Sequence, residues 1–387
     1  MKFRSLQFVA IGFLFGSSLG CQMLPGPSVK EKETQEFKKN WVRSTLNSDL
    51  NTENLDFKKS NRASAIIIDK MLIQANAFDG LGAYDLESGK QIWKKNLFNG
   101  SEAGPTLDKN LYFGASDGFF YALNPKTGEE LWKFKVGAEI LSSPSINAEH
   151  VYFLSGLNIF YALKIDTGEV DWVYSRPSSS EFSIRGGARP AIGDTQVFVG
   201  FSDGYFVSLD RRTGKMKWEV SLNKNKRFKD IDSEVILNDG LLYVSGYDDH
   251  LYCLDKTSGN TIWKIKGGSF SGPTFHENLL IYPTSTGEVW GLNKKTSQKL
   301  WSYKVTSGIA SRVTLFKSNA LFGESQGDLI LLNSQNGDVL STFTPGRGIF
   351  TAPAVDPKTS KVYFISGEAN LYSLTLKESS RSIFDFL

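Results

Sequence analysis

Few side chains in this sequence are of the types that do chemistry. The 387 residues contain three histidines, His150, His250 and His276, and two cysteines, Cys21 and Cys253. The histidines are scattered and show no spacing typical of a metal site, and there is no Gly-Lys-Ser/Thr phosphate-binding loop. Cys253 lies in the apolar run "LYCLD", where sister segments have Ala or Ser, which favours a buried small side chain over a nucleophile. We therefore expect a protein that is not an enzyme and that uses no metal and no cofactor.

Cys21 has a context that predicts a different kind of chemistry. Residues 1–20 contain two basic residues, an apolar run at 8–15 and then small residues, which is typical of a secretion signal peptide. The run is too short to cross a bilayer as a helix. Its end, "SSLGC", resembles a bacterial lipoprotein cleavage site, although Ser18 stands where that pattern prefers Leu. We expect lipidation at Cys21; the alternative is a plain secretory peptide with an incidental cysteine.

The composition predicts a folded body and argues against a nucleic-acid binder. Hydrophobic residues make up 40% of the chain and aromatic residues 13%, which is ample for a core. The formal net charge is +3, without the concentrated basic excess typical of nucleic-acid binding. Residues 21–39 are polar, charged and poor in apolar side chains, as in a flexible tether.

From residue 40 onward the chain repeats one phrase. Five segments place a glycine four residues before a tryptophan, and two weaker segments keep the spacing. These pairs are Gly89 and Trp93, Gly128 and Trp132, Gly168 and Trp172, Gly214 and Trp218, Gly259 and Trp263, Ser297 and Trp301, and Gly337 and Ser341. The 248 residues from Trp93 to Ser341 span six intervals, so the period is about 41 residues. Such a period indicates a solenoid or a propeller.

Each copy has the pattern of short β-strands. Runs such as "VYFLSG" and "IFYALK" are rich in aromatic and β-branched residues and are bounded by turn residues such as "NPKTG". The strands are apolar on both faces, as expected when each sheet packs between two neighbours. Four strands per copy, arranged radially, predict an all-β fold, a β-propeller of four-stranded antiparallel blades. We expect the recurring tryptophan to pack between blades, rather than to form a ligand cage.

The two ends of the array predict how the ring closes. An eighth copy ends without a glycine–tryptophan pair, whereas "NWVRSTL", residues 40–46, carries Trp41 with no hairpin before it. We expect this N-terminal strand to complete the last blade, which gives eight blades and leaves only short protected edges. Seven blades is the alternative. The expected organisation is a signal peptide at 1–20, a tether at 21–39, a propeller at 40–376 and a C-terminal tail at 377–387.

Two neighbouring copies carry insertions. The intervals between aligned tryptophans are 39, 40, 46, 45 and 38 residues, and the extra residues fall at 175–189 and 223–234. Both segments connect an outer strand to the next blade, so we expect them side by side on one face. Insertions clustered in this way often form the binding surface of a repeat protein.

The side chains in these insertions suit a protein partner. Phe182 and Ile184 are apolar anchors beside Arg185, and Asp230 and Asp232 flank an isoleucine. Exposed apolar residues next to an arginine and a carboxylate pair are typical of an interaction hot spot. Pairing of Arg185 with Asp230 or Asp232 inside the protein is the other interpretation, and the two can hold together.

Phrases such as "FYALNPKTGEELW" resemble the repeats of pyrroloquinoline-quinone dehydrogenases and of relatives that keep the propeller without the cofactor. A quinone enzyme would imply a calcium ion, a catalytic carboxylate and commonly a vicinal cysteine pair, and one internal cysteine cannot supply that pair. With the lipoprotein start, the closing strand and the two insertions, essentially the whole mature chain is similar to the BamB family. These are the propeller lipoproteins of the outer-membrane β-barrel assembly machinery.

The resemblance implies a binding site. In that family the first loop has a hydrophobic–x–hydrophobic–Arg-Gly motif, matched here by Phe182, Ile184 and Arg185. The second has Asp–hydrophobic–Asp, matched by Asp230 and Asp232. These positions bind a periplasmic POTRA domain of BamA in the family, where Leu is common in place of Phe182.

The resemblance also implies a role and a location. It implies a non-catalytic scaffold of the Bam complex, anchored in the outer membrane through Cys21, facing the periplasm and aiding insertion of nascent outer-membrane proteins. Gln22 after the cysteine favours outer-membrane sorting, by analogy with enteric lipoproteins. A quinoprotein-like or ligand-sensing envelope propeller is the alternative, because propellers have many functions.

Overall fold

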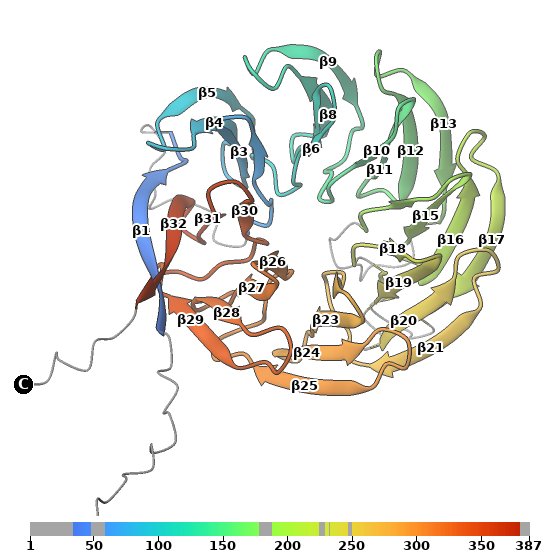
Figure 1. Cartoon of the computed structure of the whole chain (residues 1–387). Helices are drawn as coiled ribbons and strands as arrows, with labels where there is room; N and C mark the ends of the chain where they lie inside the picture. Colours follow the sequence, from blue (N-terminus) through green and yellow to red (C-terminus); the bar gives the residue numbers. More distant parts are fainter. Residues whose placement is uncertain are drawn as a thin grey trace, which may run out of the picture. The chain divides into compact units, whose positions relative to one another are not determined.

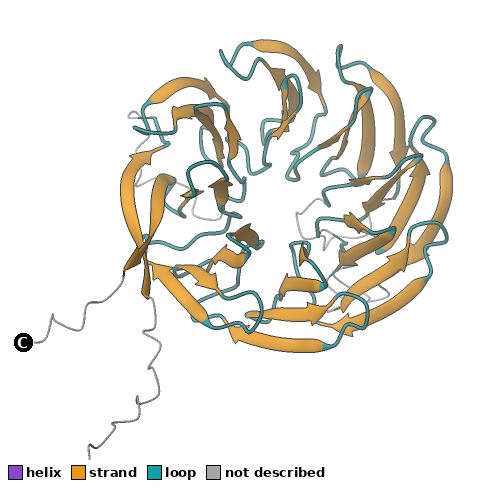
Figure 2. Ribbon diagram, viewed as in Figure 1, coloured by secondary structure: helices purple, strands orange, loops and turns teal. Residues whose placement is uncertain are grey.

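The computed structural model describes residues 34–47, 59–177, 188–223, 229–231, 233–246 and 250–379. In this part of the chain every regular element is a β-strand, and Figure 2 shows strands joined by loops around a closed ring. The strands form eight four-stranded sheets. Every strand pairing is antiparallel, as in the sheet that pairs β11 with β12 and β12 with β13. The predicted fold class, an all-β eight-bladed propeller, is confirmed, and the seven-blade alternative is wrong.

Within each blade the four strands are arranged in order from the axis of the ring to its rim (Figure 1). The innermost strands are β2 (Ile66–Ile68), β6 (Thr106–Leu107), β10 (Ser145–Ile146), β14 (Ala191–Ile192), β18 (Ile236–Asn238), β22 (Thr274–His276), β26 (Thr314–Phe316) and β30 (Ala354–Asp356). The second strands are β3 (Met71–Asn76), β7 (Leu111–Gly114), β11 (His150–Leu154), β15 (Gln196–Gly200), β19 (Leu241–Ser245), β23 (Leu279–Pro283), β27 (Asn319–Gly323) and β31 (Lys361–Ile365).

The two outer positions complete the blades. The third strands are β4 (Gly80–Asp85), β8 (Phe119–Leu123), β12 (Ile159–Lys164), β16 (Tyr205–Asp210), β20 (His250–Asp255), β24 (Glu288–Asn293), β28 (Leu329–Leu332) and β32 (Asn370–Ser379). The rim strands are β5 (Gln91–Asn96), β9 (Glu130–Lys135), β13 (Val170–Ser175), β17 (Met216–Ser221), β21 (Thr261–Lys266), β25 (Lys299–Lys304), β29 (Val339–Phe343) and β1 (Thr34–Ser44).

Adjacent blades are joined by the recurring tryptophan, but its partner glycine belongs to the next blade. Six rim tryptophans donate their indole Nε1–H to a main-chain oxygen in the following blade's outer turn, at 2.9–3.2 Å. The same ring covers the glycine of that turn; a Cβ on Gly128, for example, would lie 2.6 Å from Trp93 Cε3. The glycine and the tryptophan that are four residues apart in one copy therefore do not contact each other. Each contacts its counterpart in a neighbouring copy.

The sheet makes room for each indole ring on its own blade as well. Opposite the tryptophan, on the third strand, lies a small residue in every such blade, for example Ala83 opposite Trp93 and Cys253 opposite Trp263. Where Ser341 replaces the tryptophan, the residue opposite is Leu331. In this blade the larger side chain of the pair therefore lies on the third strand and the smaller one on the rim strand. This pairing conserves volume within the blade, which is what a close-packed interior requires.

Two joints depart from the pattern for identifiable reasons. The blade that follows Trp263 has Ser297 at the turn position, with φ of 58°, and the indole Nε1 of Trp263 finds no acceptor among the described residues. The blade that follows Ser341 has no outer turn at all, because its rim strand is β1 rather than a continuation of β32. The tryptophan is thus missing where there is no turn for it to cover.

The N-terminal strand closes the ring, as predicted. β1 pairs with β32 in one four-stranded sheet, with Trp41 opposite Ser373. The strand begins at Thr34, six residues earlier than the sequence suggested, and β32 continues to Ser379. In the added length Phe37 pairs with Leu376, and both are buried in a cluster that includes Leu374 and Phe364.

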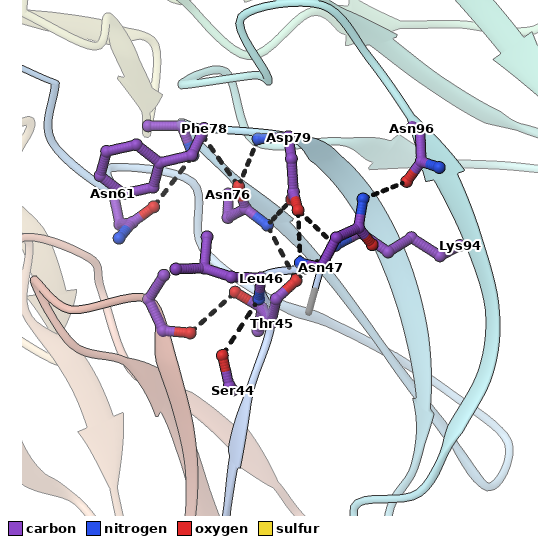
Figure 3. Close-up of polar contacts among 12 residues, drawn as sticks. Ser44, Thr45, Leu46, Asn47, Asn61, Asn76, Phe78, Asp79, Lys94 and Asn96 are labelled. Carbon is purple, nitrogen blue, oxygen red and sulfur yellow. Dashed lines mark hydrogen bonds and ion pairs between the residues drawn. The ribbon is translucent and has the colours of Figure 1, made fainter. Parts of the chain in front are cut away.

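A buried polar cluster holds the chain where it leaves β1 (Figure 3). Thr45 donates its main-chain N–H and its hydroxyl to Ala369 O, at 2.9 and 2.8 Å, in the last blade. Lys94 Nζ, in the first blade, donates to Thr45 O at 2.6 Å and to Asp79 Oδ2 at 2.8 Å. Asp79 Oδ2 also accepts the main-chain N–H of Asn47 at 2.7 Å. The segment 45–47 is therefore bonded to both the first and the last blade.

Removing the closing indole should destabilise the propeller. Trp41 is 6% exposed, donates to Leu86 O and packs on the first blade, so Trp41→Ala should lower the free energy of unfolding by about 3–5 kcal/mol. Thermal and chemical denaturation of residues 22–387 measure this. Phe98→Ala is the control, because Phe98 is 80% exposed. Equal stability of the two variants would show that Trp41 does not hold the joint.

Two glycines separate backbone strain from the tryptophan contact. Gly128 and Gly137 have φ of 74° and 77°, but only Gly128 lies under an indole ring, and nothing lies within 4 Å of a Cβ at Gly137. Gly137→Ala should lower the free energy of unfolding by about 1–2 kcal/mol, because alanine is strained in the left-handed backbone conformation. Gly128→Ala should lower the free energy of unfolding by at least about 1 kcal/mol more than Gly137→Ala does, because Trp93 must move. Similar unfolding free energies for the two variants would argue against a tight ring contact.

Candidate functional site

The two insertions lie where the sequence predicts them. The first connects β13 to β14 and the second connects β17 to β18, so both run from a rim strand to the innermost strand of the next blade. They serve consecutive blades. Phe182, Ile184, Arg185 and Asp232 lie outside the described residues, as does Cys21.

The described part of the second insertion is buried. Asp230 is 3% exposed and Ile231 is 2% exposed. Ile231 donates its main-chain N–H to Phe201 O at 3.2 Å, and a Cβ on Gly200 would lie 2.4 Å from Ile231 Cγ2. Ile231 is therefore a packed side chain, and Asp230 presents almost no surface of its own.

Ile231 occupies a position shared by several blades. Ile140 packs in the same way on Gly114, and Ile349 packs on Gly323, each at 2.2–2.3 Å from the position of a Cβ on the glycine. All three isoleucines lie in a connection between blades. Aligning these connections, rather than the strands, would have identified the isoleucine as a core residue from the sequence.

Arg176 fixes the start of the first insertion. Its Nε donates to Asp203 Oδ2 at 2.6 Å and its Nη1 pairs with Glu219, while the guanidinium lies 4.3 Å from the ring centroid of Tyr205. Burial opposes the charge, but the hydrogen bonds that Arg176 donates to Asp203 and Glu219 outweigh it and raise the pKa of Arg176. Asn158 Nδ2 donates to Pro177 O at 3.2 Å, which holds the next residue.

The ends of the two insertions are bonded to each other. Arg189 Nη1 lies 3.2 Å from Glu234 Oε1, and Val235 donates its main-chain N–H to Arg189 O at 3.1 Å. Arg312, two blades further on, pairs with the other oxygen of Glu234. Sequence reasoning missed Arg176, Arg189 and Glu234, because none of them lies within a motif.

The groups that could do chemistry are dispersed. His150 lies on β11, where its Nε2 is 2.9 Å from Asp171 Oδ2, while His250 begins β20 and His276 ends β22. Among the described residues no group of three or more His, Cys, Asp or Glu side chains is placed to hold a metal ion.

Gly-x-Ser-x-Gly, the pattern of a hydrolase nucleophile turn, occurs at 114–118, 200–204 and 323–327. Such a serine needs a strand-to-helix turn. Here all three segments join the second and third strands of a blade, so they are repeated hairpins.

Cys253 is a core residue, as its sequence context predicts. It is fully buried opposite Trp263, and burial raises the pKa of its thiol to about 11, against a lowering hydrogen bond with Tyr243. A thiol with that pKa is almost entirely protonated at neutral pH and is a poor nucleophile.

Within the described ranges no helix is long and apolar enough to cross a membrane. Eight repeated blades, with insertions anchored on two consecutive connections, define a repeat β-propeller with one distinctive face. A family model described as "Outer membrane protein assembly factor BamB" matches residues 77–248 and 230–384. The chain belongs to the BamB family of outer membrane protein assembly factors.

Individual relatives agree with this assignment. BamB of Xanthomonas campestris pv. campestris is 28% identical over 312 residues, covering 75% of this chain and 76% of the relative. BamB of Escherichia coli strain K12 is 25% identical over 328 residues, covering 80% and 83%. Among solved structures, BamB from Moraxella catarrhalis has a TM-score of 0.73 and 21% identity, and covers 88% of this chain and 99% of that one.

A solved quinohemoprotein alcohol dehydrogenase from Pseudomonas putida also has a TM-score of 0.73, at 12% identity, over 92% of this chain and 78% of its own. At this identity the likeness shows a common fold and no common activity.

The environment of Cys253 predicts its reactivity. In residues 22–387, which lack Cys21, the single thiol should not react with a thiol reagent at pH 8 while the propeller is folded, and should react at once in denaturant. Absorbance at fixed protein concentration measures both rates. Rapid reaction of the folded protein would contradict the burial of this side chain.

Proposed function

We propose that this protein is a non-catalytic scaffold of the outer-membrane β-barrel assembly machinery. The observation that carries the proposal is the family match, which extends over nearly the whole propeller, including both insertions. The structure supports it because the insertions lie on consecutive blades and their ends are fixed by Arg176, Arg189 and Glu234. Anchored loop ends reduce the ordering cost of binding a partner.

The proposed partner is BamA, through its POTRA domains, within the Bam complex. Phe182, Ile184, Arg185, Asp230 and Asp232 are the proposed binding residues. Because Asp230 is almost fully buried, we assign it to holding the second insertion in place, and leave direct contact to the other four. Nascent outer-membrane proteins are further proposed partners, which the rigid ring would help to present.

The proposed location is the periplasmic side of the outer membrane. Lipidation of Cys21 would anchor the chain in the inner leaflet, and β1 begins at Thr34. The 12 residues from 22 to 33 can span at most about 43 Å when extended. The propeller would then lie within reach of a membrane-embedded barrel and its periplasmic domains.

The quinoprotein-like or ligand-sensing alternative rests on fold similarity alone. The dehydrogenase structures are 12–14% identical to this chain. At this identity, none of their functional residues can be assigned to positions of this chain.

Binding to BamA is the direct test. Isothermal titration of residues 22–387 into the POTRA domains of BamA from the same organism should show saturable binding. Arg185→Glu should weaken it by more than about tenfold, because a charge reversal in a hot spot leaves an unpaired buried charge. The melting temperature should stay unchanged.

Arg212→Glu is the matched control, since Arg212 is an exposed arginine in the outer turn that joins β16 to β17. It should bind like the wild type. Loss of binding in both variants would place the interface elsewhere, and absence of binding by the folded wild type would overturn the partner assignment.

A further inference from the structure

The connections that enter the innermost strands contain a position that faces the axis in every blade. Of the three residues before each of these strands, the first is buried in all eight blades and the third in all but the first blade. In blade order the middle residues are Ser64, Gly104, Ser143, Arg189, Glu234, Gly272, Arg312 and Ala352.

These middle residues surround an axial cavity of about 510 Å³. Seven of the eight line it, the exception being Gly272, which is represented by its neighbour Ser271. Phe270, Phe350 and Leu141 supply an apolar part of the wall. A cavity of this size, with an apolar part of the wall and several charged groups, has the character of a small-molecule site.

The charges around this ring are unevenly paired. Glu234 is shared by Arg189 and Arg312, the latter reaching across the blade whose middle residue is Gly272. Arg62 lies 3.9 Å from Glu102 and keeps 53% of its side chain exposed. Arg62 and Glu102 each lie two residues before the middle residue of their connection, so the cavity lining holds three guanidinium groups against two carboxylates.

Glu102 is a weak partner for Arg62. Burial raises the pKa of Glu102, although Arg62 and Lys59 act to lower it. Because the long contact and the burial both weaken this pair, Arg62 retains most of its capacity to bind another anion.

The sector between Arg312 and Arg62 is the open part of the ring. The middle residue between them is Ala352, whose methyl group fills little space and carries no charge. Phe350, two residues earlier, lines the axial cavity and also an adjoining cavity of about 310 Å³. Lys59 and Arg347 line the adjoining cavity as well.

We propose that the axial cavity binds a small organic carboxylate, with its carboxylate between Arg62 and Arg312 and its apolar body against Phe350. Arginine suits this role because its planar donors match the two oxygens of a carboxylate. The competing interpretation is that the ring of charges only ties blades together across the axis. That interpretation accounts for Arg189, Glu234 and Arg312, but it leaves Arg62 only the long 3.9 Å contact with Glu102. The proposal does not depend on the BamA interface, which the insertions carry.

The test uses 2-naphthoate, which joins a carboxylate to a flat apolar body. Isothermal titration and saturation-transfer NMR on the full chain should show saturable one-to-one binding that weakens with added salt. Arg62→Gln should reduce the affinity about tenfold. Ala352→Asp should abolish binding of 2-naphthoate, because the new carboxylate would itself pair with the guanidinium groups of Arg62 and Arg312.

Two controls keep the result interpretable. Arg212→Gln removes an arginine far along the chain from the ring and should bind like the wild type. 2-Naphthamide has the same body without the charge and should bind much more weakly than 2-naphthoate. Melting temperatures show whether each variant is folded.

Absence of saturable binding at millimolar probe would overturn the proposal. So would binding that survives both Arg62→Gln and Ala352→Asp in folded variants, or equal binding of the amide. Titration with the POTRA domains of BamA reports on the insertions instead, so the two assignments fail separately.

Discussion

The contact between an indole ring and the glycine turn of the next blade is the interaction on which this propeller depends. It fixes the distance between neighbouring blades, since the ring lies directly over a backbone without a side chain, and it fixes their angle through the Nε1–H···O bond to the same turn. Each blade is apolar on both faces and cannot be stable alone. Small residues opposite each indole, such as Ala83 and Cys253, follow from the same requirement.

Ring closure adds a second constraint, because a chain has two ends and a ring has none. The last blade takes its rim strand from residues 34–44, and that strand supplies Trp41 to cover the turn at Gly89. The last blade itself then lacks an outer turn, and in the blade before it Ser341 stands where a tryptophan would have nothing to cover. The buried pair of Lys94 and Asp79 holds the chain as it leaves the closing strand.

Because the blades repeat one framework, the differences between copies are largely confined to the connections between blades. The strands must satisfy the same packing in every copy, so differences accumulate where one blade leads into the next. Both the two insertions and the charged residues Arg62, Glu234 and Arg312 of the axial cavity lie in such connections. Arg189 and Glu234 belong to both, which joins the ends of the insertions to the axial cavity. Membership of the BamB family agrees with a role in outer membrane protein assembly.

The sequence by itself determined the strands, the period, the eight blades and the closing role of Trp41, because these follow from local patterns repeated at fixed spacing. It also indicated correctly that Cys253 is buried. Only the tertiary structure decided that the tryptophan covers the next blade's glycine, that Ile231 and Asp230 are buried, and that Arg62 and Arg312 line one cavity. These facts join residues from different blades, and a spacing within one copy carries no information about which neighbour a side chain reaches.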